Sequence, residues 1–450
     1  MRGLICNSYW VVFITLSVLG LTGCNSESGG TTSDDGGTAS LPTVDTMPCN
    51  GGICTLNSGV VVGDAEARVV VANLAQGNVI LKTQNSEVLT LLSPIQWSSH
   101  RSLTLQADND IELFGGISAS QGKLIIDNPG HDYHLRKPVD LSAGQNFRVN
   151  GDEYTVITSL GQPGSTTGTD LQGISGNLNN NYALGSNIDA STTSSWNSGE
   201  GFSPIGNADD SDTTFSGSLN GLGHVIRNIH IDRSEDNYVG LFSGMIDASL
   251  IHLALENIQV QGYSSVGSFA GSIEDSKVTQ VCVIGGTITA FSDNAAGLVG
   301  SSYGDSVIVD SCILGTAIYA DHSVGGMVGY NNHNLTVEDS YAFHLNLTDE
   351  DGASEIGFIT ARDEIAAPTV INSLVHRISS TPTNPNNDSG RTPLTGSELG
   401  NLSTYQNVSW DISTDPESNS LWYLDKTYAR KVPAMLRIFE FDLTDYLHDD

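Results

Sequence analysis

The strongest constraint on the fold is an internal repeat that begins near Tyr238 and returns roughly every 30 residues. Each copy opens with a short segment of apolar residues and glycine. Five such segments are present, at 238–244, 266–271, 296–300, 324–329 and 356–359. Repeats of this length are typical of solenoids, in which one copy contacts only its two neighbours.

Two further short strands are predicted in each copy, and their apolar residues recur in columns. The columns are Ile251, Val278, Ile308, Val337 and Val370; Leu255, Cys282, Cys312, Tyr341 and Leu374; and Val260, Ile288, Ile318, Leu347 and Ile378. Three short strands cannot bury their apolar side chains alone, but stacked copies form a continuous core. The repeat therefore predicts a parallel β-helix, in preference to a β-sandwich or a propeller.

The glycines at the start of each copy have two explanations. They either adopt a left-handed backbone angle at a corner or allow close packing beneath a column of large residues. That predicted column is Phe242, Phe269, Leu298 and Met327.

The N-terminal half shows the same alternation of short β-rich runs with Asn, Asp, Gly and Ser turns. The runs are 69–71, 79–81, 89–92, 103–105, 111–113 and 124–126. Their spacing is near ten residues, and no helical periodicity is recognised. The whole folded chain is therefore predicted to be all-β, a parallel β-helix with a small C-terminal cap.

The best-preserved copy resembles the GLUG motif, a Val-Gly-Gly-Leu-Val-Gly-Tyr stretch followed by an Asn-Ser-Tyr type of turn. The matching residues are 324–331 and 338–342. Residues 215–231 and 168–206 are similar to the segments that precede such repeats in filamentous-haemagglutinin-like proteins, and 95–111 resembles their rungs. The resemblance extends over roughly 60–440 and implies a surface protein, although such adhesins use other export routes and are far longer.

The N-terminus has the features of an export signal. An apolar run of about 13 residues, 9–21, is shorter than the ~20 residues that a membrane-spanning helix needs. Leu21-Thr22-Gly23-Cys24 resembles the lipobox of bacterial lipoproteins, which implies cleavage before Cys24, diacylglycerol on its sulfur and palmitate-type acylation. Asn25 is not the aspartate that retains lipoproteins in the inner membrane, so the resemblance implies an outer-membrane anchor facing the periplasm or the cell surface.

The charge balance restricts the partners. The chain has a formal net charge of −33 at pH 7, which repels nucleic acid and anionic headgroups. The acidity serves either solubility in a salty medium or calcium binding in Asp- and Asn-rich turns, and no twelve-residue calcium loop is present. No cofactor and no metal ligand set are predicted.

Four cysteines remain in the folded part once Cys6 and Cys24 are set aside. Cys49 and Cys54 enclose a short glycine-containing loop that a disulfide can close in an oxidising compartment. Cys282 and Cys312 belong to one column, so they are predicted to lie in adjacent rungs. They either form a disulfide or pack as buried thiols.

The C-terminal part follows a linker at 379–393 that is rich in Pro, Asn and Ser. Residues 395–398 have the spacing of a capping box, which predicts a short helix with Leu399 and Leu402. Aromatic and apolar residues beyond it are predicted to cover the last rung, whose open end exposes unpaired backbone groups. They are Trp410, Trp422, Tyr423, Tyr428 and 432–436.

No catalytic residue is assigned. The chain has no His-Glu-x-x-His, so the catalytic part of the IgA-specific metallopeptidases that carry this repeat is not matched, and it has no Gly-x-Ser-x-Gly elbow or phosphate loop. A β-helical hydrolase or lyase would need clustered acids, for which the candidates are Asp209, Asp210 and Asp212, or Asp310, Glu338 and Asp339. Acids at turns are usually solvated turn formers, and His224 and His252 are predicted to be surface or turn residues.

The domain order follows from these features: signal peptide 1–23, flexible tether 24–46, haemagglutinin-like rungs 47–235, GLUG-type repeats 236–378, and linker with cap 379–450. The predicted function is a lipid-anchored adhesin or surface-binding protein, with a polysaccharide or a surface protein as ligand and the membrane as anchor. The alternatives are a polysaccharide hydrolase or lyase, and a purely structural component of the envelope or matrix.

Overall fold

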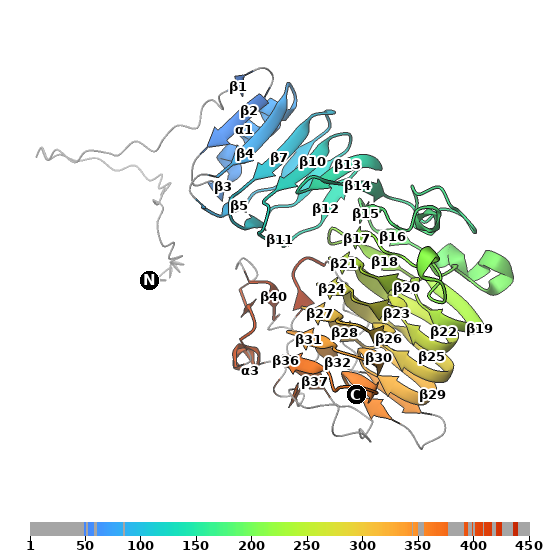
Figure 1. Cartoon of the computed structure of the whole chain (residues 1–450). Helices are drawn as coiled ribbons and strands as arrows, with labels where there is room; N and C mark the ends of the chain where they lie inside the picture. The colour runs from blue at the N-terminus through green and yellow to red at the C-terminus, as the bar shows by residue number, and fades with distance from the viewer. Residues whose placement is uncertain are drawn as a thin grey trace, which may run out of the picture. The chain divides into compact units, whose positions relative to one another are not determined.

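Parallel β-strands dominate the computed structural model, which describes residues 49–50, 53–57, 61–83, 86–343, 345–349, 355–376, 391–394, 398, 401–407, 409–415, 420–424 and 435–439. The strands coil into two β-solenoids, drawn from blue to cyan and from green to orange in Figure 1. The prediction of an all-β parallel β-helix is confirmed.

The first solenoid has three strands in each rung, and the strands of successive rungs pair in register. Leu103 pairs with Leu124, and Ile111 pairs with Tyr133. Inward-facing apolar residues alternate with outward-facing polar ones, as expected for strands with one buried face. The three stacks are β2 (Ile53–Asn57), β4 (Asn78–Lys82), β7 (Ser102–Gln106), β10 (Lys123–Asp127) and β13 (Gly144–Val149); β3 (Val61–Val62), β5 (Leu89–Leu91), β8 (Ile111–Leu113) and β11 (Tyr133–Leu135); and β6 (Ile95–Trp97), β9 (Ile117–Ala119) and β12 (Val139–Leu141).

A helix occupies the place of the first predicted strand. Residues 69–71 belong to α1 (Asp64–Leu74), so the predictions of a strand there and of no helix were wrong. The buried residues Ala67, Val70 and Leu74 have helical spacing, and Glu66 accepts a hydrogen bond from the Gly63 backbone N–H at 3.1 Å. The helix packs against β3, β4 and β6 and buries apolar residues at the end of the first core.

A hairpin separates the two solenoids. Strand β13 pairs antiparallel with β14 (Asp152–Ile157), and the turn between them is Asn150-Gly151, with φ of 49° and 99°, as a two-residue hairpin requires. From β14 onward the strands of the shared sheet run in the opposite direction. The core changes face with them, because Val156 packs in the first core and its neighbour Ile157 in the second.

The second solenoid contains the repeats that begin near Tyr238. Three 3-10 segments, at 172–176, 191–199 and 211–213, lie in the connections of its first rungs. The stacks are β15 (Asn181–Leu184), β17 (Ser218–Asn220), β21 (Ser249–Ile251), β24 (Lys277–Thr279), β27 (Val307–Val309), β31 (Thr336–Glu338) and β36 (Thr369–Ile371); β18 (Val225–Arg227), β22 (Ala254–Gly267), β25 (Cys282–Ala296), β28 (Cys312–Leu314), β32 (Tyr341–Phe343), β37 (Ser373–His376) and β38 (Arg391–Leu394); and β20 (Phe242–Ile246), β23 (Ala270–Glu274), β26 (Val299–Tyr303), β30 (Val328–Asn331) and β35 (Thr360–Asp363).

The predicted columns match the observed register from the second copy onward. Val278, Ile308 and Val337 stack with Val370, and Ile308 is completely buried. In the first copy the predicted residue is wrong by one position in three columns. The true members are Leu241 rather than Phe242, Leu250 rather than Ile251, and Ala254 rather than Leu255.

The backbone geometry of the repeat glycines decides between the two explanations for them. A Cβ on Gly326 would lie 1.9 Å from the Phe358 carbonyl oxygen, and a Cβ on Gly297 would lie 2.3 Å from that of Gly326. Neither glycine has a positive φ. These glycines therefore allow close approach of adjacent rungs, and the left-handed corners are formed mainly by Asn, Asp, Ser and His.

Cys282 and Cys312 pair in register between β25 and β28, as predicted. Their Cα atoms are 4.5 Å apart and the two residues form a disulfide, with both side chains completely buried. Cys49 and Cys54 face each other across the antiparallel β1 (Cys49–Asn50) and β2, and their side chains lie outside what the structure describes.

The C-terminal segment packs against the side of the second solenoid, not on its last rung as predicted. Trp410 stacks on Tyr341 and Trp422 packs against it at a tilt, with ring centroids 6.2 and 5.6 Å away. The Trp410 Nε1–H donates to the Asn372 carbonyl at 2.7 Å. The reason is that the outward column containing Cys282, Cys312 and Tyr341 is itself apolar and must be covered. The elements are α3 (Leu402–Gln406), β39 (Ile412–Ser413), β40 (Trp422–Tyr423) and β41 (Met435–Leu436), shown in red-brown in Figure 1.

The C-terminal elements differ in part from the predicted boundaries. Helix α3 is capped by Asn401, whose side chain accepts from the Ser403 N–H. Strand β38 pairs with β37, so the parallel stack continues to Leu394, beyond the predicted boundary at 378. The signal peptide, Cys24, the tether, Ile378, residues 395–397 and Tyr428 lie outside the described residues. Within the described part, no helix has the length and apolarity to cross a membrane.

Candidate functional site

The outer face of the stack β5, β8 and β11 provides a set of polar and aromatic side chains. Ile111 and Leu113 point into the first core, so Glu112 between them points outward. His134 lies beside Glu112 on the next rung, because β11 pairs in register with β8. Phe114 and Arg136 follow the two strands and form a second outward pair.

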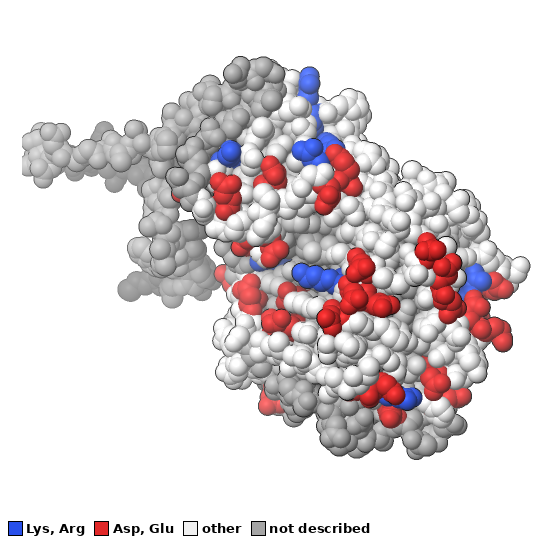
Figure 2. Space-filling view, in the orientation of Figure 1, with Lys and Arg blue, Asp and Glu red and all other residues white. Residues whose placement is uncertain are grey.

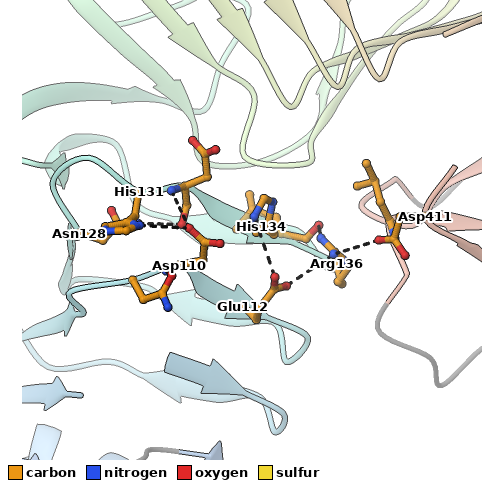
Figure 3. A network of polar contacts seen from close by, with 11 residues as sticks. Asp110, Glu112, Asn128, His131, His134, Arg136 and Asp411 are labelled. Carbon is orange, nitrogen blue, oxygen red and sulfur yellow. Dashed lines mark hydrogen bonds and ion pairs between the residues drawn. The ribbon is translucent and has the colours of Figure 1, made fainter. Parts of the chain in front are cut away.

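Arg136 is the centre of this set, as Figure 3 shows. Its guanidinium Nη2 lies 3.5 Å from Glu112 Oε2 and 4.0 Å from Asp411 Oδ2 of the C-terminal segment. The guanidinium also lies over the Phe114 ring, 5.7 Å from its centroid. Only 8% of its side chain is exposed, whereas 62% of the Asp411 side chain is. Arg136 is therefore buried, and Asp411 forms the exposed edge of the set.

Burial changes the acid–base properties of the two partners in opposite directions. Burial raises the pKa of Glu112, and the charges of Arg136 and His134 oppose the change. Burial lowers the pKa of Arg136, and the charges of Glu112 and Asp411 oppose it. His134 Nε2 lies 3.9 Å from Glu112 Oε1. We call Glu112, Phe114, His134, Arg136 and Asp411 the inter-solenoid cleft.

A neighbouring group of polar contacts supports the turn before β11. His131 Nδ1 lies 3.8 Å from Asp110 Oδ1, and the Asn128 side-chain amide donates to the Asp132 carbonyl at 2.7 Å. The Asp132 backbone N–H donates to Asp110 Oδ1 at 3.1 Å. These contacts, visible in Figure 3, hold the chain that carries His134 into the cleft.

Two histidines of the second solenoid are buried near this set of residues. His224 is 2% exposed and donates through Nε2 to the Val139 carbonyl at 2.9 Å; burial lowers its pKa. His252 is 1% exposed and packs edge-on against Tyr133, with ring centroids 5.6 Å apart. Burial lowers the pKa of His252 to about 3, and the charges of His134 and Arg136 add to the effect. Both histidines are therefore core residues. The prediction that they are surface or turn residues was wrong about the surface, although His252 does lie at a corner of the chain with φ of 57°.

Beyond His252, one corner residue of each rung continues along the solenoid in a row that we call the corner ladder. Each adopts a left-handed φ. The N–H of each of the first four donates to the carbonyl before the next corner, as Gln280 N does to Val309 O at 3.0 Å. The members and their φ angles are His252 57°, Gln280 52°, Asp310 49°, Asp339 46° and Asn372 50°.

The candidate catalytic acids lie in two different places. Asp209, Asp210 and Asp212 are exposed, and Asp210 Oδ1 accepts from the Asp212 N–H in a turn. Asp310 and Asp339 belong to the corner ladder. Burial raises the pKa of Asp310 to about 7, and the neighbouring charge of Asp339 adds to the increase while hydrogen bonding to Trp422 opposes it.

Sequence reasoning did not identify the cleft. Glu112 could have been placed on an outward face from the alternation Ile-Glu-Leu, but Arg136 brings it near Asp411, which lies far along the chain. Figure 2 shows basic side chains next to acidic ones in the recess between the two solenoids. In the part of the chain that the structure describes, no group of three or more His, Cys, Asp or Glu side chains could hold a metal ion.

Comparison with known proteins gives two similarities and no family. No family model matches the chain. The chain is 39% identical over 175 residues to Halomucin of Haloquadratum walsbyi, a match that covers 36% of this chain and 2% of that protein. The chain thus spans about 2% of the length of this relative. Among solved structures it is similar to a protein described as a "putative immunoglobulin A1 protease" from Bacteroides ovatus, with 15% identity and a TM-score of 0.42, over 63% of this chain and 92% of the other.

Proposed function

We propose that this protein is an exported, lipid-anchored β-helix that binds a neutral polysaccharide at the cell envelope. The observation that carries the proposal is the inter-solenoid cleft, in which the half-buried Phe114 ring lies beside the carboxylates of Glu112 and Asp411 and the His134 imidazole. Sugar rings stack on flat π-surfaces through their apolar faces, and carboxylates accept hydrogen bonds from their hydroxyls. The net charge of −33 disfavours an anionic polymer.

The disulfide supports export. Cys282 and Cys312 are completely buried beneath the aromatic residues of the C-terminal segment. Disulfides of this kind persist in oxidising compartments outside the cytoplasm and are rare in reducing ones. The lipobox-like residues 21–24 give the means of retention, and Asn25 after the cysteine favours the outer membrane.

Anchoring is tested by Cys24→Ser. The variant should lose lipid labelling and move from the detergent phase to the aqueous phase in detergent phase separation. A variant that partitions with membranes as strongly as wild type would contradict the anchor. Protease treatment of intact cells then shows whether the chain faces the cell surface.

Binding is tested with the unlipidated Cys24→Ser chain on a glycan array and by affinity electrophoresis in gels that contain neutral polysaccharides. Phe114→Ala should weaken binding about three- to tenfold, the range expected for losing one stacking contact, and Glu112→Gln should weaken it as well. Gln96→Ala is the matched control, because Gln96 is an exposed outward residue on β6.

Two results would contradict the proposal. Unchanged binding in both cleft variants would place the glycan elsewhere, and capture of a surface protein with no glycan bound would replace the polysaccharide by a protein ligand. The same samples are assayed for new reducing ends and unsaturated uronates. Either product would show a hydrolase or lyase and replace the binding function by an enzymatic one.

A further inference from the structure

The triplet Asn-x-Ser/Thr, in which x is not proline, is confined to the part of the chain from residue 334 onward. It begins at Asn334, Asn346, Asn387, Asn401 and Asn407. None of the 25 asparagines before Asn334 begins such a triplet, whereas five of the nine from Asn334 onward do. This triplet is the acceptor sequence for N-linked glycans in exported proteins. Asn387 lies outside the described residues.

The four described asparagines of these triplets lie on the surface of the folded chain. Asn334 follows β30 and precedes β31, and Asn346 begins β33 (Asn346–Asp349). Asn401 and Asn407 lie at the two ends of α3. All four side chains are exposed. A sugar attached to any of them would therefore project into solvent without displacing a core side chain.

In two of the triplets, the hydroxyl two residues later contacts the asparagine side chain. The Thr348 hydroxyl donates to Asn346 Oδ1 at 3.5 Å, and the Ser403 hydroxyl donates to Asn401 Oδ1 at 2.8 Å. In β33 the pairing follows from the alternation of the strand, because the middle residue Leu347 is buried and its two neighbours face outward. The two side chains that define the triplet therefore lie together on the folded surface.

The amide nitrogens of these asparagines can be substituted without loss of structure. Asn401 caps α3 through Oδ1, which accepts a backbone N–H, so a sugar on Nδ2 leaves the cap intact. Asn334 Nδ2 donates to Asp305 at 3.0 Å. Asn346 Nδ2 donates to the Tyr319 hydroxyl at 3.4 Å. Both contacts are at the surface, and an amide that carries one sugar still has one N–H to donate.

We propose that Asn334, Asn346 and Asn401 carry N-linked glycans transferred from a glycosyl diphosphate. In this reaction Nδ2 forms a bond to C1 of the sugar and the bond between C1 and the phosphate oxygen breaks. The diphosphate leaves with its carrier, and one amide proton passes to a base. The carrier is either a lipid outside the cytoplasm or a nucleotide inside it.

A glycan on Asn346 would also protect an edge of the second solenoid. Among the described strands, β33 pairs only with β29 (Ala317–Gly325). An open strand edge is a place where another chain can pair, and a bulky sugar on the strand would obstruct it. The proposal goes beyond the polysaccharide proposed for the cleft and does not depend on it.

Glycosylation is measured on the full chain purified from the cells that produce it. Intact mass spectrometry should show at least one sugar beyond the mass of the lipidated polypeptide, and fragmentation of its peptides should locate sugars on Asn334, Asn346 and Asn401. Lipid and sugar add different masses, and Cys24→Ser should lose the lipid and keep the sugars. Failure of the anchor is therefore distinguishable from failure of the glycosylation.

Thr336→Val and Thr348→Val test the role of the hydroxyl, because valine keeps the shape and the β-propensity of threonine. Each should lower the sugar occupancy of its own asparagine at least about tenfold and leave the other site unchanged, since the triplet needs Ser or Thr. The matched controls Thr336→Ser and Thr348→Ser keep the hydroxyl and should keep the sugar. Gln259→Thr creates a triplet at the exposed Asn257 and should add a sugar there, a gain that misfolding cannot produce.

A chain without residues 1–23, which stays in the cytoplasm, identifies the donor. Sugar on this chain would indicate a nucleotide-linked donor, and sugar on the exported chain alone would indicate a lipid-linked one. The proposal is overturned if the exported chain has the mass of the lipidated polypeptide alone. It is also overturned if Thr336→Val and Thr348→Val carry as much sugar at these sites as wild type.

Discussion

His252→Asn should remove a specific dependence of stability on pH. Asn is chosen because it tolerates the left-handed φ of 57° at this position and does not titrate. The pKa of His252 is lowered to about 3 by burial in the folded protein, whereas an unfolded histidine has a pKa of about 6.5. Between these values the unfolded chain binds the proton and the folded chain does not.

The sign and size of the effect follow from proton linkage. Stability from the neutral His252 is fully present above pH 6.5 and is lost as the pH falls toward 3, at about 1.4 kcal/mol for each pH unit. From pH 7 to pH 4.5 the free energy of unfolding of the wild type should therefore fall by about 2.5 kcal/mol more than that of His252→Asn. Other groups titrate in the same range, but they are common to both proteins and cancel in the difference.

The assay is urea unfolding of both proteins at pH 7, 5.5 and 4.5, followed by tryptophan fluorescence. His100→Asn, at an exposed histidine, supplies the control for the general effect of replacing a histidine by asparagine. A difference between wild type and His252→Asn that stays constant from pH 7 to pH 4.5 would refute the reasoning. It would mean that His252 is hydrated or protonated in the folded protein.

Three other changes test the packing of the second solenoid by thermal unfolding. Ile308→Asp places an unpaired charge in a completely buried column and should cost about 3 kcal/mol or more, whereas Asp293→Ala on a half-buried part of β25 should cost under about 0.5 kcal/mol; equal melting temperatures would contradict the register. Cys282→Ala with Cys312→Ala should cost about 2–4 kcal/mol, and a reductant should lower the melting temperature of wild type but not that of the double variant. Gly326→Ala should cost about 1–3 kcal/mol, because its Cβ would meet a carbonyl oxygen at 1.9 Å; a variant as stable as wild type would show that adjacent rungs can separate there.

The register error in the first repeat has a physical cause. At each of the three positions two large or apolar residues are adjacent, as in Leu241-Phe242 and Leu250-Ile251. A period of two identifies the inward residue only where the other face is polar. In this solenoid the outward column is also buried, since the C-terminal segment covers Ala254 and Cys282 completely. The alternation that fixes register in most strands is therefore lost.

The helix α1 was missed for a related reason. Its sequence contains Val69-Val70-Val71, three residues with high β-propensity. Only Ala67, Val70 and Leu74 are buried, so few apolar positions mark the helical period. The end of a solenoid core needs a cover with no free strand edge, and a helix provides it. Tertiary position, more than local preference, decides the conformation of this segment.

What the sequence determined by itself is everything that repeats along the chain: the parallel β-helix, the adjacent rungs of Cys282 and Cys312, and the buried position of Ile308. Repeated rungs contact their nearest neighbours, so their pairing is written in a short stretch of sequence. The tertiary structure alone decided what happens between distant segments. The hairpin at Asn150-Gly151 reverses the strands and moves the core to the other face of the sheet, and only this reversal and the lateral packing of the C-terminal segment bring Arg136 to Asp411 and Trp422 to Asp310.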